Sequence, residues 1–463
     1  MSMAIQMRPA TLRAGRGEDG GLRDDHLAYI DQAAYLQQRA TGVGKLAQAV
    51  WVYEHPLNMD ALKRFHANLD HSLIGRRVET SVLPFGRHRW VSAEGAPIAV
   101  SAPRSRADLS DWIDERSAVP TDPEIGPSWH LGVLPMDDGS VAISLAASHV
   151  VTDGIGLLRS IADAAEGRTR HLGYAPARSR STLTALRADL RQTARDMPEV
   201  GRTVAAAAKL AYRRRHELRQ PASPRAAAAT VAEGGKPVII PAITAFIDAK
   251  HWDSCAEMRN GTTYSLLAGF AARLAERTGR HRPDDGAVSL LIAISERTPD
   301  DTRANAVAIT NACVDPARVT ADLSESRIAI RQAITTLREV PDETFALLPL
   351  NPFVPKRAVK RAADIMFGDL PVSCSNLGEI DPAVGRVDGT DAEYFMLRGV
   401  DQNLTREQIE RAGGQLVVAS VRLGDMISLG IVSYEPGRTN TKRRLRDLTT
   451  LTLAEFDLYG EIV

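Results

Sequence analysis

An apolar stretch that runs into a short polar loop and then into an amphipathic segment constrains this chain more than any other feature. Residues 141–147 (VAISLAA) have the character of a buried strand, and residues 148–154 (SHVVTDG) that of a loop. Residues 155–162 (IGLLRSIA) have the apolar spacing of a helix. A strand that delivers a loop to a helix can hold a reactive side chain rigidly. We therefore expect an α/β fold organised around this loop.

The loop carries the pattern His149-x-x-x-Asp153-Gly154. An imidazole with a pKa near neutrality can take a proton from a hydroxyl or an amine, and a glycine permits a tight turn. Random placement of the histidines, aspartates and glycines of this chain would give about 0.06 such matches, so the pattern is suggestive. It fits a site histidine, and it also fits a histidine at a strand end followed by an Asp-Gly turn.

The length of 463 residues exceeds what one ordinary hydrophobic core supports, so we expect two lobes. Alternating strand and helix patterns place an N-terminal lobe at residues 23–170 and a C-terminal lobe at 236–463. Residues 1–22, which end in a Gly-rich charged run, are predicted to be a disordered lead-in. Residues 171–235 differ from both lobes and are predicted to be a basic helical insert and linker.

The insert has a strong charge bias. Residues 176–230 contain 11 Arg and one Lys against four acidic residues. Apolar spacing predicts one amphipathic helix at 183–197 and another at 204–218, followed by a flexible linker at 221–237. A solvated basic face explains this bias. Contact with anionic lipid or with a phosphorylated carrier is the alternative explanation. In its membrane form, residues 176–220 would make a peripheral membrane contact.

Composition argues against several classes of protein. Lys plus Arg equals Asp plus Glu at 57 each, so no global basic charge favours nucleic acid. No apolar run reaches the length of about 18 residues needed to span a membrane, and the N-terminus lacks the apolar core of a secretory signal. No metal-ligand spacing, phosphate loop or dinucleotide fingerprint occurs, so we predict neither a metal nor a cofactor. The chain is expected to be cytoplasmic, at most peripheral at the inner membrane surface.

The chain has three widely spaced cysteines, Cys255, Cys313 and Cys374. Their spacing favours a reducing compartment, and we expect each of them to lie in a core.

Four features follow one another in the order of a known family. They are residues 57–78, the His149 motif, Ile294-Ser295-Glu296-Arg297 with Asn305, and Ser375-Asn376-Leu377-Gly378. Together they resemble the condensation-domain-like, chloramphenicol-acetyltransferase-like acyltransferase superfamily. The Ser-Asn-Leu-Gly stretch is most similar to the polyketide-associated acyltransferases. The long insert is more similar to the wax ester synthase/diacylglycerol acyltransferase branch.

The resemblance implies an α/β architecture of two chloramphenicol-acetyltransferase-like lobes, each a mixed sheet flanked by helices, with an active-site tunnel between them. A thioester of CoA or of an acyl carrier protein would be the acyl donor and co-substrate. An alcohol or an amine would be the acceptor. His149 would act as the general base, a role typically worth about 10²–10⁴-fold in rate.

The resemblance also assigns roles around His149. Asp153 is implied to be structural and to pair with Arg297 from the other lobe, with Gly154 beside it. Ser148 replaces the first of the two adjacent histidines that many members carry. Ser375 and Asn376 are candidates for binding substrate at the developing oxyanion, although an ordinary strand end also explains them. A non-catalytic module that binds an acyl carrier or lipid and recruits partners is the alternative function. A serine hydrolase is disfavoured because no Gly-x-Ser-x-Gly turn occurs.

Overall fold

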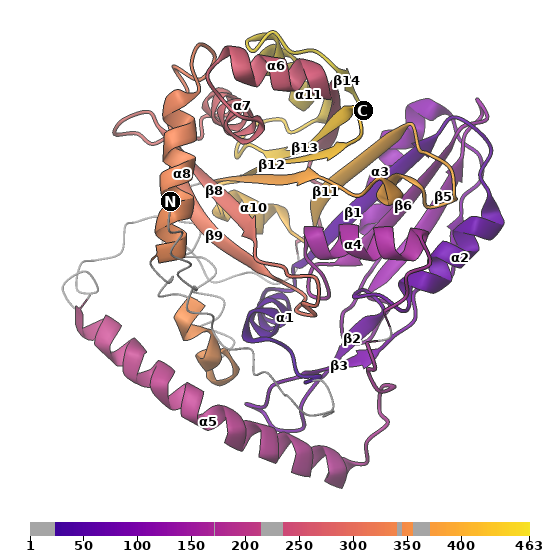
Figure 1. Cartoon of the computed structure of the whole chain (residues 1–463), viewed down its shortest axis with the longest axis vertical. Helices are drawn as coiled ribbons and strands as arrows, with labels where there is room; N and C mark the ends of the chain where they lie inside the picture. Colours follow the sequence, from indigo (N-terminus) through magenta and orange to yellow (C-terminus); the bar gives the residue numbers. More distant parts are fainter. Residues whose placement is uncertain (1–23, 171, 214–234, 340–344, 355–370) are drawn as a thin grey trace, which may run out of the picture.

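Two mixed sheets with flanking helices form two lobes that lie side by side (Figure 1). The computed structural model describes residues 24–170, 172–213, 235–339, 345–354 and 371–463. The predicted lead-in at 1–22 and most of the predicted linker at 221–237 lie outside these ranges. The mixed α/β architecture with two lobes is confirmed.

The first sheet has the strand order β11-β1-β6-β5-β4. Its strands are β1 (Gly44–Tyr53), β4 (Ala99–Val100), β5 (Trp129–Pro135), β6 (Val141–Ser148) and β11 (Tyr394–Gln402). Strand β6 lies at the centre, antiparallel to β1 and β5. One face of the sheet packs against α2 (Met59–Leu69) and α4 (Gly154–Ala165), and the other against α3 (Leu109–Ala118). Helix α1 (Tyr29–Thr41) and the hairpin of β2 (Arg76–Glu79) and β3 (Arg89–Ser92) complete this lobe.

The second sheet has the order β14-β7-β13-β12-β10-β8-β9. Its strands are β7 (Ala242–Asp248), β8 (Val288–Ser295), β9 (Val307–Val314), β10 (Val372–Glu379), β12 (Gln415–Leu423), β13 (Met426–Tyr434) and β14 (Glu461–Ile462). Strand β10 is parallel to both of its neighbours, β8 and β12, while the other pairs are antiparallel. The covering helices are α6 (Ala249–Met258), α7 (Thr263–Arg277), α8 (Ser324–Glu339) and α11 (Lys442–Ala454).

Strand β11 links the two lobes. It pairs antiparallel with β1 along its whole length, from Tyr394 opposite Val52 to Gln402 opposite Gly44. It also lies against β13, because a Cβ at Gly430 would stand only 2.5 Å from the carbonyl oxygen of Leu397. The chain after residue 379 therefore returns to the first sheet, so residues 236–463 contribute to both lobes.

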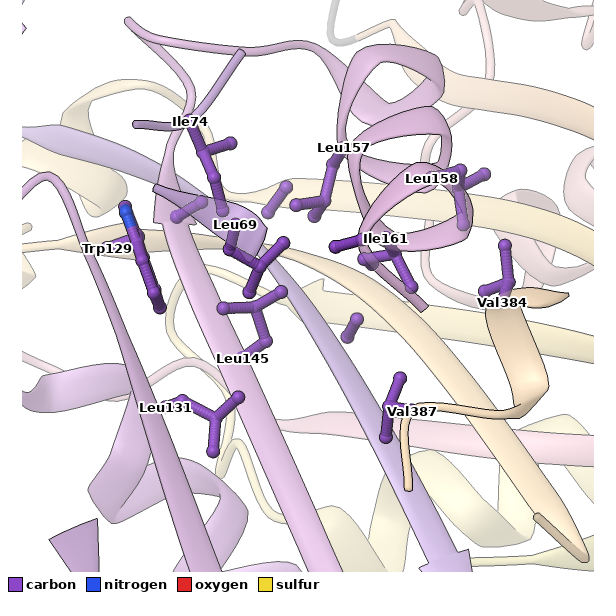
Figure 2. Close-up of a cluster of buried hydrophobic side chains, with 14 of the residues drawn as sticks. Leu69, Ile74, Trp129, Leu131, Leu145, Leu157, Leu158, Ile161, Val384 and Val387 are labelled. Carbon is purple, nitrogen blue, oxygen red and sulfur yellow. The ribbon is translucent and has the colours of Figure 1, made fainter. Parts of the chain in front are cut away.

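The core of the first lobe fixes helix α4 over the sheet (Figure 2). Leu157, Leu158 and Ile161 of α4 are buried in the same cluster as Leu145 of β6. Val384, which follows β10, closes the cluster. Burying a leucine or isoleucine side chain is worth about 1.5–3 kcal/mol, so this packing anchors the helix whose first turn follows the His149 loop.

Side-chain caps and a tight turn define the ends of several elements. Asn58 caps α2, its Oδ1 accepting from the Ala61 N–H at 3.1 Å. Thr262 and Ser265 form a capping box at the start of α7. Strands β12 and β13 form a hairpin at Gly424. The remaining short helices are η1 (Arg106–Asp108), η3 (Phe345–Phe353), η4 (Pro382–Gly385) and α10 (Arg406–Arg411).

Other expectations were wrong. Residues 182–213 form one helix, α5 (Thr182–Arg213), that continues through Pro198, although the sequence predicted two. Side chains on both sides of this proline are buried against the body, among them Asp189 and Val200, so tertiary contacts override the break. Cys313 is exposed, although the sequence analysis favoured a core position for it. Among the described residues, no helix combines the length and apolar character needed to cross a bilayer.

Candidate active site

Strand β6 places His149 at the end of the central pair of strands in the first sheet. Ser148 ends the strand opposite Leu46 of β1. The next residue, His149, donates its backbone N–H to the carbonyl oxygen of Lys45 at 2.7 Å. The histidine backbone is therefore fixed to β1, and its side chain is half-buried at the base of α4.

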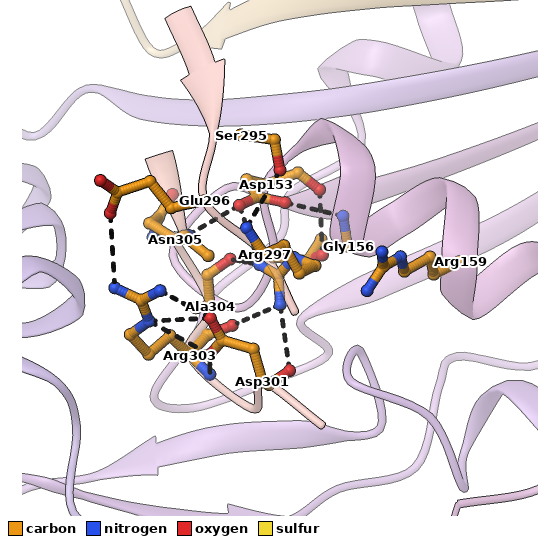
Figure 3. A network of polar contacts seen from close by, with 12 residues as sticks. Asp153, Gly156, Arg159, Ser295, Glu296, Arg297, Asp301, Arg303, Ala304 and Asn305 are labelled. Atoms are coloured by element: carbon orange, nitrogen blue, oxygen red, sulfur yellow. Dashed lines mark hydrogen bonds and ion pairs between the residues drawn. The ribbon is translucent and has the colours of Figure 1, made fainter. Parts of the chain in front are cut away.

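Asp153 uses both carboxylate oxygens in structural contacts. Its Oδ1 caps α4 by accepting from the Gly156 N–H at 2.7 Å. Its Oδ2 accepts from the backbone N–H of Ala306 and from Nη2 of Arg297, each at 2.8 Å. The carboxylate is almost fully buried and points into the second lobe (Figure 3). It consequently positions the loop and is not directed at His149 as a proton acceptor.

Arg297 is the partner that the resemblance implied for Asp153. Its side chain has no exposed area, and it comes from the loop of residues 296–306 between β8 and β9. Besides Asp153, it donates to the carbonyl oxygens of Ala304 at 2.8 Å and of Arg303 at 2.9 Å (Figure 3). A guanidinium has a fixed fork of donors, so one side chain joins the loop to itself and to the first lobe.

Asn305 contacts His149 directly. Its Nδ2 lies 3.3 Å from the carbonyl oxygen of His149 and 3.2 Å from Oδ1 of Asp31. The backbone N–H groups of Ala304 and Asn305 also donate to Asp31, at 2.9 and 2.8 Å. Asp31, in α1, is completely buried, and burial raises its pKa while the Arg76 guanidinium and these donors oppose that rise. Sequence reasoning left Asp31 unassigned, because a lone aspartate within a helix gives no sign of its distant partners.

Arg76 and two further arginines extend this contact between the lobes. The buried Arg76 guanidinium lies 4.1 Å from the centre of the Trp90 ring and donates to the Thr302 carbonyl oxygen at 2.7 Å. Arg159 of α4 and Arg170 donate to carbonyl oxygens of the same loop at 2.9 and 2.6 Å. The loop of residues 296–306 is thus held by four separate parts of the first lobe.

Burial lowers the pKa of His149 below its ordinary value. The Asp153 carboxylate acts in the opposite direction, and the nearby Lys45 ammonium adds to the lowering. Asn305 also raises the pKa through a side-chain hydrogen bond. The lowered pKa keeps the imidazole neutral at pH 7, which is the form that can accept a proton.

The remaining candidates from the sequence are Ser148, next to His149, and the pair Ser375 and Asn376 on β10. Ser148 is buried, and its Oγ accepts from the Val150 N–H at 3.3 Å, so it shapes the turn. Asn376, on β10 next to Ser375, accepts with Oδ1 from the Gly378 N–H at 2.9 Å and from the Ser420 hydroxyl at 3.3 Å. Its amide nitrogen is therefore the group suited to donate to a substrate.

Gly154 explains how the β10 segment reaches the motif. A Cβ at this position would lie 3.0 Å from Cδ2 of Leu377, so the glycine admits the leucine against the start of α4. Leu377 packs on the core of the first lobe. The structure thus brings the Ser375–Gly378 stretch to the base of the helix that follows His149.

A cavity of about 210 Å³ lies beside β11, between α3 and the segment that precedes β7. Asp114 and Arg398 form a buried ion pair at 2.8 Å in its lining. His149, Ser375 and Asn376 do not line it. The tunnel between the lobes therefore stays a prediction.

One group of side chains has the spacing of metal ligands within the part of the chain that the structure describes. Ligand atoms of Asp24, Asp25 and His26 lie within 4.8 Å of one another. The pKa of Asp24 is lowered to about 2, since hydrogen bonds from His26 and the charge of Arg87 outweigh its desolvation. Asp25 pairs with Arg89 at 3.3 Å. Asp24 and Asp25 therefore each have a basic partner within the protein.

Comparison with known proteins finds similarity in three dimensions only. No family model matches the sequence, and no curated protein sequence matches it. The wax ester synthase/diacylglycerol acyltransferase from Marinobacter aquaeolei VT8 superposes with a TM-score of 0.52 at 13% identity, over 93% of this chain and 98% of that one. The first condensation domain of the CDA synthetase gives 0.53 at 13% identity, over 95% and 99%.

A third similar structure is the TRI3 trichothecene 15-O-acetyltransferase from Fusarium sporotrichioides. Its TM-score is 0.55 at 13% identity, over 93% of both chains. At such identities a likeness establishes the fold and leaves the activity to the site itself. All three superpositions cover nearly the whole length of each chain, so the match includes both lobes and their arrangement. This chain has the two-lobed α/β fold that these three proteins share.

Proposed function

We propose that this protein is an acyltransferase that moves an acyl group from a thioester of CoA or of a carrier protein to a hydroxyl or amine acceptor. The observation that carries the proposal is His149, a half-buried imidazole with a lowered pKa at the end of a central strand. Its loop is held by contacts with both lobes. Structurally similar proteins include an acetyltransferase and a wax ester synthase, which supports acyl transfer as the reaction class.

In the proposed reaction the neutral His149 ring accepts the acceptor's proton as its oxygen or nitrogen attacks the thioester carbonyl carbon. A tetrahedral intermediate forms, and its oxygen carries the negative charge. When the intermediate collapses, the C–S bond breaks and the imidazolium returns the proton to the leaving thiolate. General-base help of this kind contributes typically about 10²–10⁴-fold.

The other residues have supporting roles in this proposal. Asp153 and Arg297 are positioning residues, because their charged groups contact each other and the loop backbone. The Asn376 amide nitrogen and the Ser375 hydroxyl are the candidate donors to the oxyanion. A preorganised donor of this type is worth about 10²–10³-fold. Removal of a donor would therefore lower kcat with little effect on substrate affinity.

The test is a thiol-release assay on the purified chain. Acyl-CoAs and acyl-pantetheine thioesters of graded chain length serve as donors, so that a carrier-type donor is represented, and alcohols and amines serve as acceptors. Products are identified by mass spectrometry. We expect acceptor-dependent release that falls by about 10²-fold or more in H149A. The exposed His281 provides the matched control H281A, which should retain activity.

Two results would count against the proposal. Thiol release that H149A leaves unchanged would remove the histidine from the mechanism. Binding of an acyl-pantetheine without transfer to any acceptor would favour the alternative, a non-catalytic module that recruits an acyl carrier.

A further inference from the structure

Helix α5 presents a line of apolar side chains to solvent. Leu183, Leu190, Met197 and Val204 recur every seven residues and are 68%, 52%, 49% and 52% exposed. Seven residues are nearly two helical turns, so these side chains form one stripe along the helix. We call these four residues the apolar stripe. Figure 1 shows α5 along the lower edge of the molecule, away from α6 and α11.

Exposed apolar side chains are concentrated on α5 and are not scattered evenly over the surface. Of the sixteen exposed large apolar side chains in the described part of the chain, six lie on α5, including Leu186 and Tyr212. Scattered apolar residues are normal on protein surfaces, whereas a contiguous apolar patch marks an interaction site. This distribution therefore indicates that α5 is an interaction site.

A neighbouring side of α5 is firmly attached to the body. Ala185, Val200 and Thr203 are buried on that side. Asp189 accepts from the Ser81 hydroxyl at 2.6 Å and from the Val82 N–H at 3.0 Å. The apolar stripe is thus displayed by a preformed helix, so binding would not require the helix to fold first.

The charges of α5 are sorted between its two sides. Arg187, Arg191 and Arg195 are exposed, and none of them forms an ion pair with another described residue. The helical period places these arginines along one flank of the apolar stripe. The acids face the body instead, where Asp189 binds Ser81 and Asp196 pairs with Arg87 at 3.3 Å. The outward face of this stretch consequently carries cations without acids.

Further apolar side chains lie beside the helix. Val82, whose N–H donates to Asp189, is 49% exposed. Phe85 is 53% exposed, and its ring stacks on that of Phe353 in η3, with the ring centres 5.9 Å apart. Since η3 packs against α5, these groups extend the apolar area next to the stripe.

We propose that α5 docks this protein on a membrane surface that contains anionic lipid. The apolar stripe would enter the interface, and the flanking arginines would lie among the headgroup phosphates. Charge complementarity favours this occupant, because the face combines apolar side chains with cations and has no outward acid. The inference stands on α5 alone and does not depend on acyl transfer.

The first experiment measures flotation of the full chain with vesicles of phosphatidylcholine alone and of equimolar phosphatidylcholine and phosphatidylglycerol. Binding should require the anionic lipid and weaken as salt is raised. Two variants test the face: the apolar variant L183S/L190S/M197S and the charge variant R187Q/R191Q/R195Q. We expect each to lower the partition coefficient about tenfold or more.

Matched controls carry the same changes at exposed positions elsewhere. They are M258S/I328S/L451S, at residues that are 70%, 51% and 54% exposed, and R64Q/R411Q/R443Q. Both controls should bind vesicles as the unaltered chain does. If circular dichroism shows that the apolar variant does not fold, vesicle binding by the charge variant alone tests the proposal.

A fluorescent reporter locates the contact. All five tryptophans are buried, with at most 2% exposure, so brominated lipid should not quench them: Trp51, Trp90, Trp112, Trp129 and Trp252. A new tryptophan in M197W should be quenched by brominated phosphatidylcholine in anionic vesicles, whereas one in L451W should not. The proposal is overturned if vesicles do not bind, if the controls lose binding equally, or if the stripe variants instead abolish self-association or carrier-protein binding.

Discussion

Replacing Arg297 by methionine should destabilise the folded chain strongly. The side chain is fully buried, and its loss removes the 2.8 Å ion pair with Asp153 and three hydrogen bonds to loop carbonyl oxygens. Leaving a buried charge without its partner costs about 3–5 kcal/mol. Asp153 keeps two backbone donors, from Gly156 and Ala306, which places the electrostatic part near the lower end. We expect a total loss of about 4 kcal/mol, a large part of the roughly 5–15 kcal/mol of a typical domain.

A double-mutant cycle separates the ion pair from the rest of this loss. D153N leaves the arginine buried without its counter-charge, but Oδ1 of the asparagine can still cap α4. The double variant D153N/R297M has neither charge, so its loss should be smaller than the sum of the two single losses. We expect a coupling energy of about 2 kcal/mol, within the range found for residues in contact.

The assay is urea unfolding followed by tryptophan fluorescence, because all five tryptophans are buried and both lobes contain at least one. R303M is the control, since Arg303 belongs to the same loop but its side chain is 40% exposed. Its removal should cost about 1 kcal/mol or less. A coupling energy below about 0.5 kcal/mol between the two buried charges would refute the reasoning.

Two further predictions concern proton transfer and the strand that links the lobes. Burial lowers the pKa of His149, and a general base must be neutral, so kcat/KM should fall only when the pH drops below about 6.5, the ordinary pKa of histidine. Because the Lys45 charge lowers the same pKa, K45Q should move this acid limb of the pH profile to higher pH. An acid limb at or above pH 6.5 in the unaltered chain would contradict this prediction. G430A should lower the urea midpoint clearly, because the added Cβ would stand 2.5 Å from the Leu397 carbonyl oxygen, whereas G399A, with its nearest neighbour at 4.0 Å, should not.

Features with a local cause were predictable from the sequence. The apolar run of β6 and the spacing of α4 are read within a few residues of His149, and their periods differ. The caps of α2 and α7, Asn58 and Thr262, are likewise local, because each accepts from a backbone N–H three residues downstream. The His149 motif itself belongs to this class, because its strand, loop and helix are contiguous.

Features that depend on distant partners were not predictable in this way. The segment 394–402 (YFMLRGVDQ) mixes apolar and polar residues. It joins the first sheet as β11 by pairing with β1, which lies far upstream in the chain, so its local sequence does not reveal this role. The sequence pattern around Asp31 is that of an ordinary polar residue in an amphipathic helix, because its donors, Ala304 and Asn305, are distant in the chain. Likewise α5 is continuous through Pro198 because the body holds it on both sides, which no local propensity encodes.

The reactivity proposed for His149 depends on the contact between the lobes. Burial sets its lowered pKa, and Asn305, from the second lobe, contributes to the surroundings of the ring. The same loop carries Arg297, which pairs with Asp153 of the first lobe, and its backbone N–H groups donate to the Asp31 carboxylate. If the lobes separated, water would reach the imidazole and raise its pKa, and these carboxylates would lose their partners in the same step. Keeping the base neutral and keeping the lobes together therefore require the same contacts, so variants that loosen the loop should lose stability and shift the pH profile together.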